Sequence, residues 1–204
     1  MKFLKDYEVQ DLISESPKGS NTNFLKSSHS LWTRFGNYDK HPPFVHIDNN
    51  QYVSIIFATR SDKTKYVNLY EIVTIQGEEG KGYATKVWNE HASYCVKRGM
   101  QRIKLSCTPD SIGFHKKNGL VFWAVDKQGS LRSDQPIQNC IKKQNELRDL
   151  ALRNPSLVIP DNKVCERLKK EDIETLQLSN KKLLDTYQAI QEVEKYWFRK
   201  YLYK

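Results

Sequence analysis

Apolar and polar positions follow two different periods along the first half of the chain, and these periods predict its elements. Residues 43–47 and 51–60 are rich in β-branched and aromatic residues and flank an Asp-Asn-Asn tripeptide, so they predict a β-hairpin. A third run of the same kind, residues 66–75, follows a short polar segment. We therefore expect three consecutive strands that form an antiparallel meander.

A helical period follows these strands. Between residues 84 and 96 the apolar positions recur every three or four residues, which predicts an amphipathic helix that ends near Gly99. Residues 102–107 then predict a short strand, residues 111–118 a compact helix and residues 120–125 another strand. This order of elements indicates an α/β (α+β) domain, in which helices flank a mixed, mainly antiparallel sheet.

The pattern changes after Pro136, where helical periods continue without further strands. We therefore predict an α/β domain at residues 1–133 and a C-terminal helical extension at residues 134–204. Apolar residues recur in alternating steps of three and four between residues 173 and 201. Such a seam fits a helix that packs on its own domain, and it also fits one that joins two copies in a homodimer. The first forty residues predict one short helix, at residues 23–32.

The chain carries 33 lysines and arginines against 24 acidic residues, which gives a formal net charge of +9. This charge predicts an anionic partner and leaves open whether that partner is nucleic acid, an acidic protein or a phosphorylated cofactor. The four cysteines lie far apart without a C-x-x-C pair, which indicates buried small side chains and no metal site. No apolar run is long enough to span a membrane, so we expect no membrane partner and a cytoplasmic location.

The junction at residues 79–84, Glu-Gly-Lys-Gly-Tyr-Ala, places two glycines and a lysine between the third strand and the long helix. The start of a helix has unpaired N–H groups and partial positive charge, so phosphate binds there if the backbone can come close. Gly80 and Gly82 permit that approach, while Lys81 adds charge and Thr85 offers a hydroxyl. The junction has neither the Walker nor the dinucleotide fingerprint.

This junction resembles the acetyl-CoA-binding segment of the GNAT superfamily of acyltransferases, whose pattern is Arg/Gln-x-x-Gly-x-Gly/Ala after a central strand. A second segment, residues 107–123, is similar to the family's Asn-x-x-Ala-x-x-Phe-Tyr-x-Lys-x-Gly-Phe pattern. Within it the family's Asn, Phe, Lys and Gly positions are assigned to Asp110, Phe114, Lys117 and Gly119, and Gly113 lies near the Ala position. The two segments together cover about residues 65–125.

The resemblance implies a GNAT-like fold and an acetyl-CoA-dependent N-acetyltransferase, in which an amine attacks the acetyl thioester directly. It assigns Glu71, on the strand before the glycines, as the general base that deprotonates the amine. His115, where many members have a tyrosine, is assigned as the acid that protonates the leaving thiolate. The residues implied for acetyl-CoA binding are Val73, Thr74, Ile75, Glu79, Gly80, Lys81, Gly82, Tyr83, Ala84, Thr85, Asp110, Phe114 and Lys117.

The motifs do not specify the acceptor. The basic surface favours an amine on a macromolecule, either a protein lysine or a nucleic-acid amine, and residues 34–44 are the candidate acceptor-side loop. Phage DNA-modifying proteins of the Mom type share this fold, so DNA modification is one option. The alternative function is a non-catalytic GNAT-like module that recruits a protein or nucleic-acid partner, because Glu79 places a carboxylate beside the expected pyrophosphate.

Overall fold

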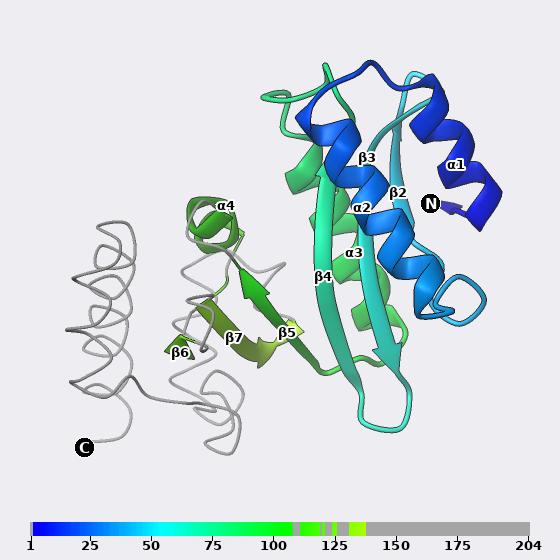
Figure 1. Ribbon diagram of the computed structural model, residues 1–204. Coiled ribbons are helices and arrows are strands. Elements are labelled where there is room, and N and C mark those ends of the chain that lie inside the picture. The colour runs from blue at the N-terminus through cyan, green and yellow to red at the C-terminus, as the bar shows by residue number, and fades with distance from the viewer. Residues whose placement is uncertain (1, 108–110, 119, 121–123, 126–130, 138–204) are drawn as a thin grey trace, which may run out of the picture. The chain divides into compact units, whose positions relative to one another are not determined.

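The computed structural model describes residues 2–107, 111–118, 120, 124–125 and 131–137 (Figure 1). The chain divides into two compact units, Met1–Met100 and Gln101–Lys204. The first unit contains β1 (Lys2–Phe3), α1 (Asp6–Glu15), α2 (Ser20–Arg34), β2 (Phe44–Asp48), β3 (Gln51–Ser61), β4 (Tyr66–Thr74) and α3 (Tyr83–Lys97). The second contains β5 (Arg102–Cys107), α4 (Ile112–Lys117), β6 (Ala124–Val125) and β7 (Leu131–Pro136).

The strands of the first unit form an antiparallel sheet in the order β1, β2, β3, β4. Asp48 pairs with Gln51, so the hairpin turns through only Asn49 and Asn50. These two residues have φ angles of 47° and 63°, and asparagine tolerates this left-handed region better than most residues. The predicted meander of three strands is confirmed, and its turn has the two left-handed residues that the right-handed twist of a hairpin favours.

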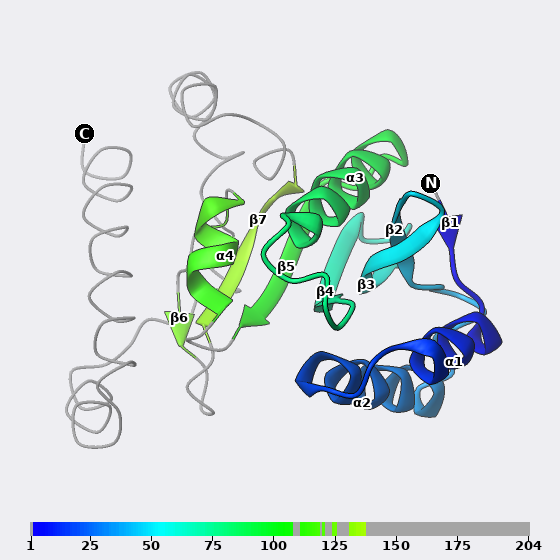
Figure 2. The ribbon, with the colours of Figure 1, turned by 90° about the horizontal axis from the view of Figure 1, so that it is seen from above.

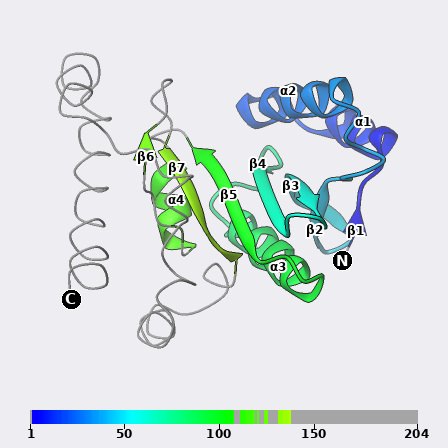
Figure 3. The same cartoon turned by 90° about the horizontal axis from the view of Figure 1, so that it is seen from below.

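Helices cover both faces of this sheet, with α1 and α2 on one face and α3 on the other (Figures 2 and 3). Val45, Ile55 and Val73 lie opposite one another across β2, β3 and β4, and they bury against Leu25 and other apolar residues of α1 and α2. Alternate strand positions bury against α3. Each such side chain contributes about 1.5–3 kcal/mol when it leaves water, so the two helical layers hold the sheet in place.

The long helix α3 ends at Lys97, close to Gly99, as the sequence predicts. Gly99 has a φ of 76°, its N–H donates to the carbonyl of Val96 at 2.9 Å, and the N–H of Met100 donates to the carbonyl of Cys95 at 3.0 Å. This pair of bonds is the Schellman motif, which satisfies the last carbonyls of a helix and requires a residue that accepts a positive φ. Glycine fits that position because it has no Cβ.

In the second unit β7 pairs with both β5 and β6, antiparallel in each case. The predicted strand at 102–107 and the predicted helix at 111–118 are confirmed. β7 was not predicted, because its sequence Leu-Arg-Ser-Asp-Gln-Pro has no apolar alternation. The predicted boundary between residues 133 and 134 falls inside this strand. The seam at 173–201 lies outside the described residues.

The N-terminal helices are more extensive than the sequence predicts. The single helix expected at 23–32 is the middle of α2, and α1 precedes it. Cys95 and Cys107 are buried and free, which confirms their predicted role as small core side chains. Within the described ranges no group of three metal-ligating side chains comes together. None of the helices in those ranges has the length and apolarity that crossing a bilayer requires.

Candidate active site

The glycine junction forms a tight loop between the end of β4 and the start of α3. Gly80 and Gly82 have φ angles of 77° and 80°, which L side chains rarely adopt. A Cβ added at either position would meet no heavy atom within 4 Å, so the space beside this backbone is open. Tyr83 and Ala84 occupy the first two helical positions, whose N–H groups have no acceptor within the helix. The loop therefore presents free N–H groups beside open space, as a phosphate site requires.

Glu79, the departure from the family pattern, is a structural anchor of this loop. Its Oε2 accepts from the N–H of Gly77 at 2.7 Å, and its Oε1 accepts from the side-chain amide of Asn21 at 2.8 Å. Asn21 belongs to the first turn of α2, and its amide also donates to the carbonyl of Thr74 at 2.9 Å. Both carboxylate oxygens are thus engaged by hydrogen-bond donors, and the loop is tied to α2. Sequence reasoning missed Asn21, since no motif marks it.

Other predicted cofactor residues differ in what they can offer a ligand. The side chains of Val73 and Ile75 are buried in the core, so only their backbone groups can contact a ligand. Lys81 forms an exposed ion pair with Glu78 at 2.8 Å. The hydroxyl of Tyr83 donates to a carboxylate oxygen of Asp48 at 2.6 Å, and this hydrogen bond raises the pKa of Tyr83 to about 12. The pairing ties the first turn of α3 to the β2–β3 hairpin.

Glu71 lies at an irregularity of β4. The register changes from Phe57 opposite Glu71 to Ala58 opposite Leu69, so Tyr70 is an extra residue and the strand has a β-bulge there. Bulges re-aim the side chains beside them and are frequent at active sites. Tyr70 is 58% exposed and its ring packs edge-on against Trp32, with the ring centroids 5.4 Å apart.

The surroundings of Glu71 favour its neutral form. Its position opposite Phe57 turns it toward α2, where the hydroxyl of Ser28 donates to its Oε2. Burial raises the pKa of Glu71 to about 7 from its ordinary value of 4.5. A carboxyl that titrates near neutral pH suits a general base, because it is available to take a proton and can release it again. Ser28 is a second site residue that the sequence analysis missed.

His115 lies in α4, in the second unit, and is 8% exposed. Burial lowers the pKa of His115 to about 4, so the imidazole is neutral at pH 7. The neutral ring is a weak proton donor, and the role of His115 as the acid stays a prediction. Its ring packs edge-on against that of Phe114, with the ring centroids 5.1 Å apart.

The remaining predicted residues of the second segment are Lys117 and Asp110. Lys117 is exposed at the last position of α4. Asp110 lies outside the described residues, and it stands four positions before Phe114, where the family pattern has six. The spacing therefore does not support the assignment of Asp110 to the Asn position.

Comparison with known proteins bears directly on this site. The sequence profile of the acetyltransferase (GNAT) family matches residues 7–120, which include the glycine loop, Glu71 and α4. The chain belongs to the GNAT family. It therefore carries an N-acetyltransferase domain, and the resemblance inferred from the two motifs is confirmed. No curated protein sequence matches the chain.

Solved structures of GNAT enzymes share the fold. A chimera of spermidine N-acetyltransferase SpeG from Vibrio cholerae and hSSAT superposes with a TM-score of 0.54 at 12% identity, over 70% of this chain and 98% of that one. Aminoglycoside 6'-acetyltransferase type Ii superposes with a TM-score of 0.53 at 14% sequence identity, and the match covers 67% of this chain and 96% of that one. The PaiA N-acetyltransferase from Thermoplasma acidophilum was solved in complex with coenzyme A. It superposes with a TM-score of 0.50 at 12% sequence identity, and the match covers 66% of this chain and 96% of that one. At these identities the likeness establishes the fold, and the fold class predicted from the sequence is confirmed.

Proposed function

We propose that this GNAT protein transfers the acetyl group of acetyl-CoA to an amine on a macromolecule by direct attack on the thioester. The observation that carries the proposal is Glu71, a half-buried carboxyl with a pKa near 7 on the strand that leads into the glycine loop. One strand thus joins a general base to a phosphate-binding helix start. The net charge of +9 supports a macromolecular acceptor in preference to a small metabolite.

The glycine loop fits the pyrophosphate of acetyl-CoA. The N–H groups of Tyr83 and Ala84 would donate to its oxygens, and the missing side chains of Gly80 and Gly82 leave the space that it needs. Acetyl-CoA supplies a thioester whose acyl carbon accepts a nucleophile. The backbone of Val73 to Ile75 lies between the loop and Glu71, so it would hold the cofactor along the same strand.

Glu71 would take the proton that the acceptor amine must lose. A lysine-like ammonium has a pKa near 10.4, so its deprotonation at pH 7 costs about 4–5 kcal/mol. A carboxylate held near the amine lowers this cost by accepting the proton as attack begins. The proton passes from Glu71 to solvent after the reaction, which restores the base.

Ser28 would help Glu71 to hold that proton. Its oxygen lies within hydrogen-bond distance of both the carbonyl of Phe24, at 2.9 Å, and Oε2 of Glu71, and its single hydrogen can serve only one of these two acceptors at a time. When Glu71 is protonated, it can donate to the Ser28 oxygen while Ser28 donates to Phe24. All three groups are then satisfied, so this contact favours the protonated base.

No dedicated acid is needed for the leaving sulfur. Since His115 is neutral, we propose that the second proton lost by the acceptor nitrogen balances the proton gained by the thiolate. The amine then loses two protons in total, one to Glu71 and one to the thiol product, which closes the proton balance. In this scheme His115 serves to pack α4.

The alternative of a non-catalytic module rested on Glu79. Because Asn21 and Gly77 engage both of its oxygens, Glu79 has a structural function in the loop and is no sign of a decayed cofactor site. The retained base at Glu71 also favours the enzyme. We therefore favour an acetyltransferase over a non-catalytic module that recruits a partner.

An acetyl-transfer assay with radiolabelled acetyl-CoA tests the proposal. An acidic protein with exposed lysines, an amine-bearing nucleic acid and a small polyamine are compared at equal amine concentration. We expect at least one macromolecule to be acetylated faster than the polyamine, since the basic protein surface concentrates polyanions and repels a polycation. Fastest transfer to the polyamine would refute the macromolecular acceptor, and transfer to none of the three would count against the proposed reaction.

A further inference from the structure

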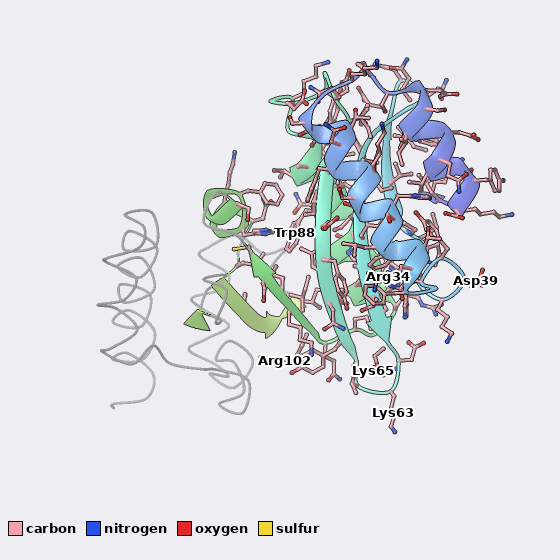
Figure 4. The ribbon with its side chains drawn as sticks, viewed as in Figure 1. Arg34, Asp39, Lys63, Lys65, Trp88 and Arg102 are labelled. Atoms are coloured by element: carbon pink, nitrogen blue, oxygen red, sulfur yellow. The ribbon has the colours of Figure 1, made fainter. Side chains whose placement is uncertain are left out.

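The end of the first unit opposite the glycine loop is strongly basic. We call it the basic end and define it as the loop at 34–43, the β3–β4 hairpin at 60–66 and the C-terminus of α3 at 97–98. It holds seven cationic residues against two acidic ones. The cations are Arg34, Lys40, Arg60, Lys63, Lys65, Lys97 and Arg98, and the acids are Asp39 and Asp62. Figure 4 shows Arg34, Asp39, Lys63 and Lys65 at this end of the unit.

Several of these cations act on one another. Both Arg60 and Lys40 contribute to lowering the pKa of His41, after burial, which is the largest cause. Burial is the largest cause of the lowered pKa of Arg60, and Arg98 also lowers this pKa, whereas Cys95, Tyr94 and Asp62 raise it. The backbone N–H of Arg60 lies 3.4 Å from Nδ1 of His41, and Trp32 donates to the carbonyl of His41 at 2.9 Å. The candidate acceptor-side loop is thus fixed to the end of β3.

Arg60 is a half-buried cation that forms no ion pair within the described residues. Its guanidinium lies 3.4 Å from Nε2 of His91 and 3.5 Å from the carbonyl of Pro42, which are long contacts, and it stacks over the ring of Phe3 at 5.2 Å. A guanidinium has five N–H donors in a rigid fork that suits phosphate or carboxylate. The contacts with His91 and Pro42 use two of the five N–H groups, so the others remain for an anion.

One exposed aromatic ring and one exposed aliphatic side chain accompany these charges. Phe35 is 68% exposed and follows Arg34 directly, and Leu31, one turn earlier on α2, is 45% exposed. Cationic side chains interleaved with exposed rings are the pattern of single-strand binding, where the cations meet phosphates and the rings stack on bases. A single strand offers phosphates to the cations and bases to the ring of Phe35. The combination therefore favours nucleic acid.

We propose that the basic end binds a single-stranded nucleic acid that carries the acceptor amine. The statement that this strand carries the acceptor amine rests on the proposed function, whereas the binding itself does not. β4 runs from the hairpin to the glycine loop over nine residues, about 30 Å, and Glu71 lies between its two ends. The acceptor strand and acetyl-CoA would therefore reach the base from opposite ends of one strand.

Fluorescence anisotropy with a labelled single-stranded oligonucleotide of about 20 nucleotides tests the binding. The Lys63→Gln/Lys65→Gln variant removes one exposed and one half-buried cation of the hairpin, and Lys18→Gln/Lys26→Gln removes two exposed cations from other parts of the unit as a control with the same change of charge. We expect the hairpin variant to weaken binding at least fivefold. We also expect the slope of log affinity against log salt to fall by about 1.4, since each lost phosphate contact contributes about 0.7. The control variant should change neither the affinity for the oligonucleotide nor this slope.

The Phe35→Ala variant separates stacking from charge. It should weaken oligonucleotide binding several-fold and leave the salt slope unchanged, because no ion is displaced. Polyglutamate serves as the second probe. Tighter binding of polyglutamate than of the oligonucleotide, equal losses in the two lysine pairs, or no oligonucleotide binding at all would each overturn the proposal. The affinity for acetyl-CoA, measured on the same variants, should be unaffected. Acetyl-CoA binding tests the proposed function and oligonucleotide binding tests this inference, so the failure of one can be told from the failure of the other.

Discussion

Replacing Glu71 with glutamine should lower kcat by about 10²–10⁴-fold, the range that a general base contributes. The amide keeps the shape of the carboxyl and a contact with Ser28, but it cannot accept the proton of the amine. In the wild type the rate should rise with pH through about 7, because burial raises the pKa of Glu71 to that value and only the ionised form is a base. The variant should lose this rise and keep its affinity for acetyl-CoA.

Stability supplies an independent readout of the same carboxyl. The pKa of Glu71 is raised in the folded state, so the folded protein binds the proton more tightly than the unfolded chain does. This contribution is fully present below pH 4.5, the ordinary pKa, and is lost as the pH rises through about 7. Glu71→Gln should therefore melt at a higher temperature than the wild type at pH 8, and the difference should shrink toward pH 4.5.

Glu15→Gln is the matched control, since Glu15 is exposed at the end of α1. It should change neither the rate nor the melting temperature. A kcat for Glu71→Gln within threefold of the wild type would mean that Glu71 does not transfer the proton. Catalysis would then rest on positioning of the amine and polarisation of the thioester.

The second large effect is expected from Gly82→Val, which should weaken acetyl-CoA binding about 100-fold or more. Gly82 has a φ of 80°, and the added side chain would enter the open space that the pyrophosphate needs. Loss of two hydrogen bonds to a charged group, about 1.5–3 kcal/mol each, accounts for a change of this size. Equilibrium dialysis with radiolabelled acetyl-CoA measures it.

Backbone strain must be separated from crowding of the ligand. Gly36 offers the control, because it also has a positive φ, 62°, and open space around a Cβ. Gly36→Val pays a similar conformational cost, about 1–2 kcal/mol, at a position far along the chain from the glycine loop. It should bind acetyl-CoA normally. Equal affinities for the two variants would show that the pyrophosphate does not approach Gly82.

The elements that the sequence predicted well are those in which local chemistry decides the outcome. The hairpin turn was marked by Asn49 and Asn50, which tolerate positive φ, and the end of α3 was marked by Gly99. The glycine loop was found for the same reason. β7 was missed because its pairing partners, and not its composition, make it a strand.

The parts of the site that the sequence could not supply depend on contacts between distant residues. Nothing in the alternation of β4 shows that Tyr70 is the extra residue of a bulge, so the environment of Glu71 could not be derived. Asn21 meets Glu79 across 58 positions, and Ser28 meets Glu71 across 43. Glu79 was therefore the ground for the non-catalytic alternative, although its partners make it an anchor of the loop. His115 was assigned by residue type, and the burial that lowers its pKa to about 4 could not be derived from the sequence.

The most direct test of the account is a titration of ¹⁵N-labelled protein with acetyl-CoA, followed through the backbone amide resonances. The N–H groups from Gly80 to Thr85 should show the largest chemical-shift changes, because the pyrophosphate is proposed to bind at the start of α3. The amides of the basic end should stay close to their free positions. Amides of the glycine loop that remain unshifted at millimolar acetyl-CoA would contradict the account.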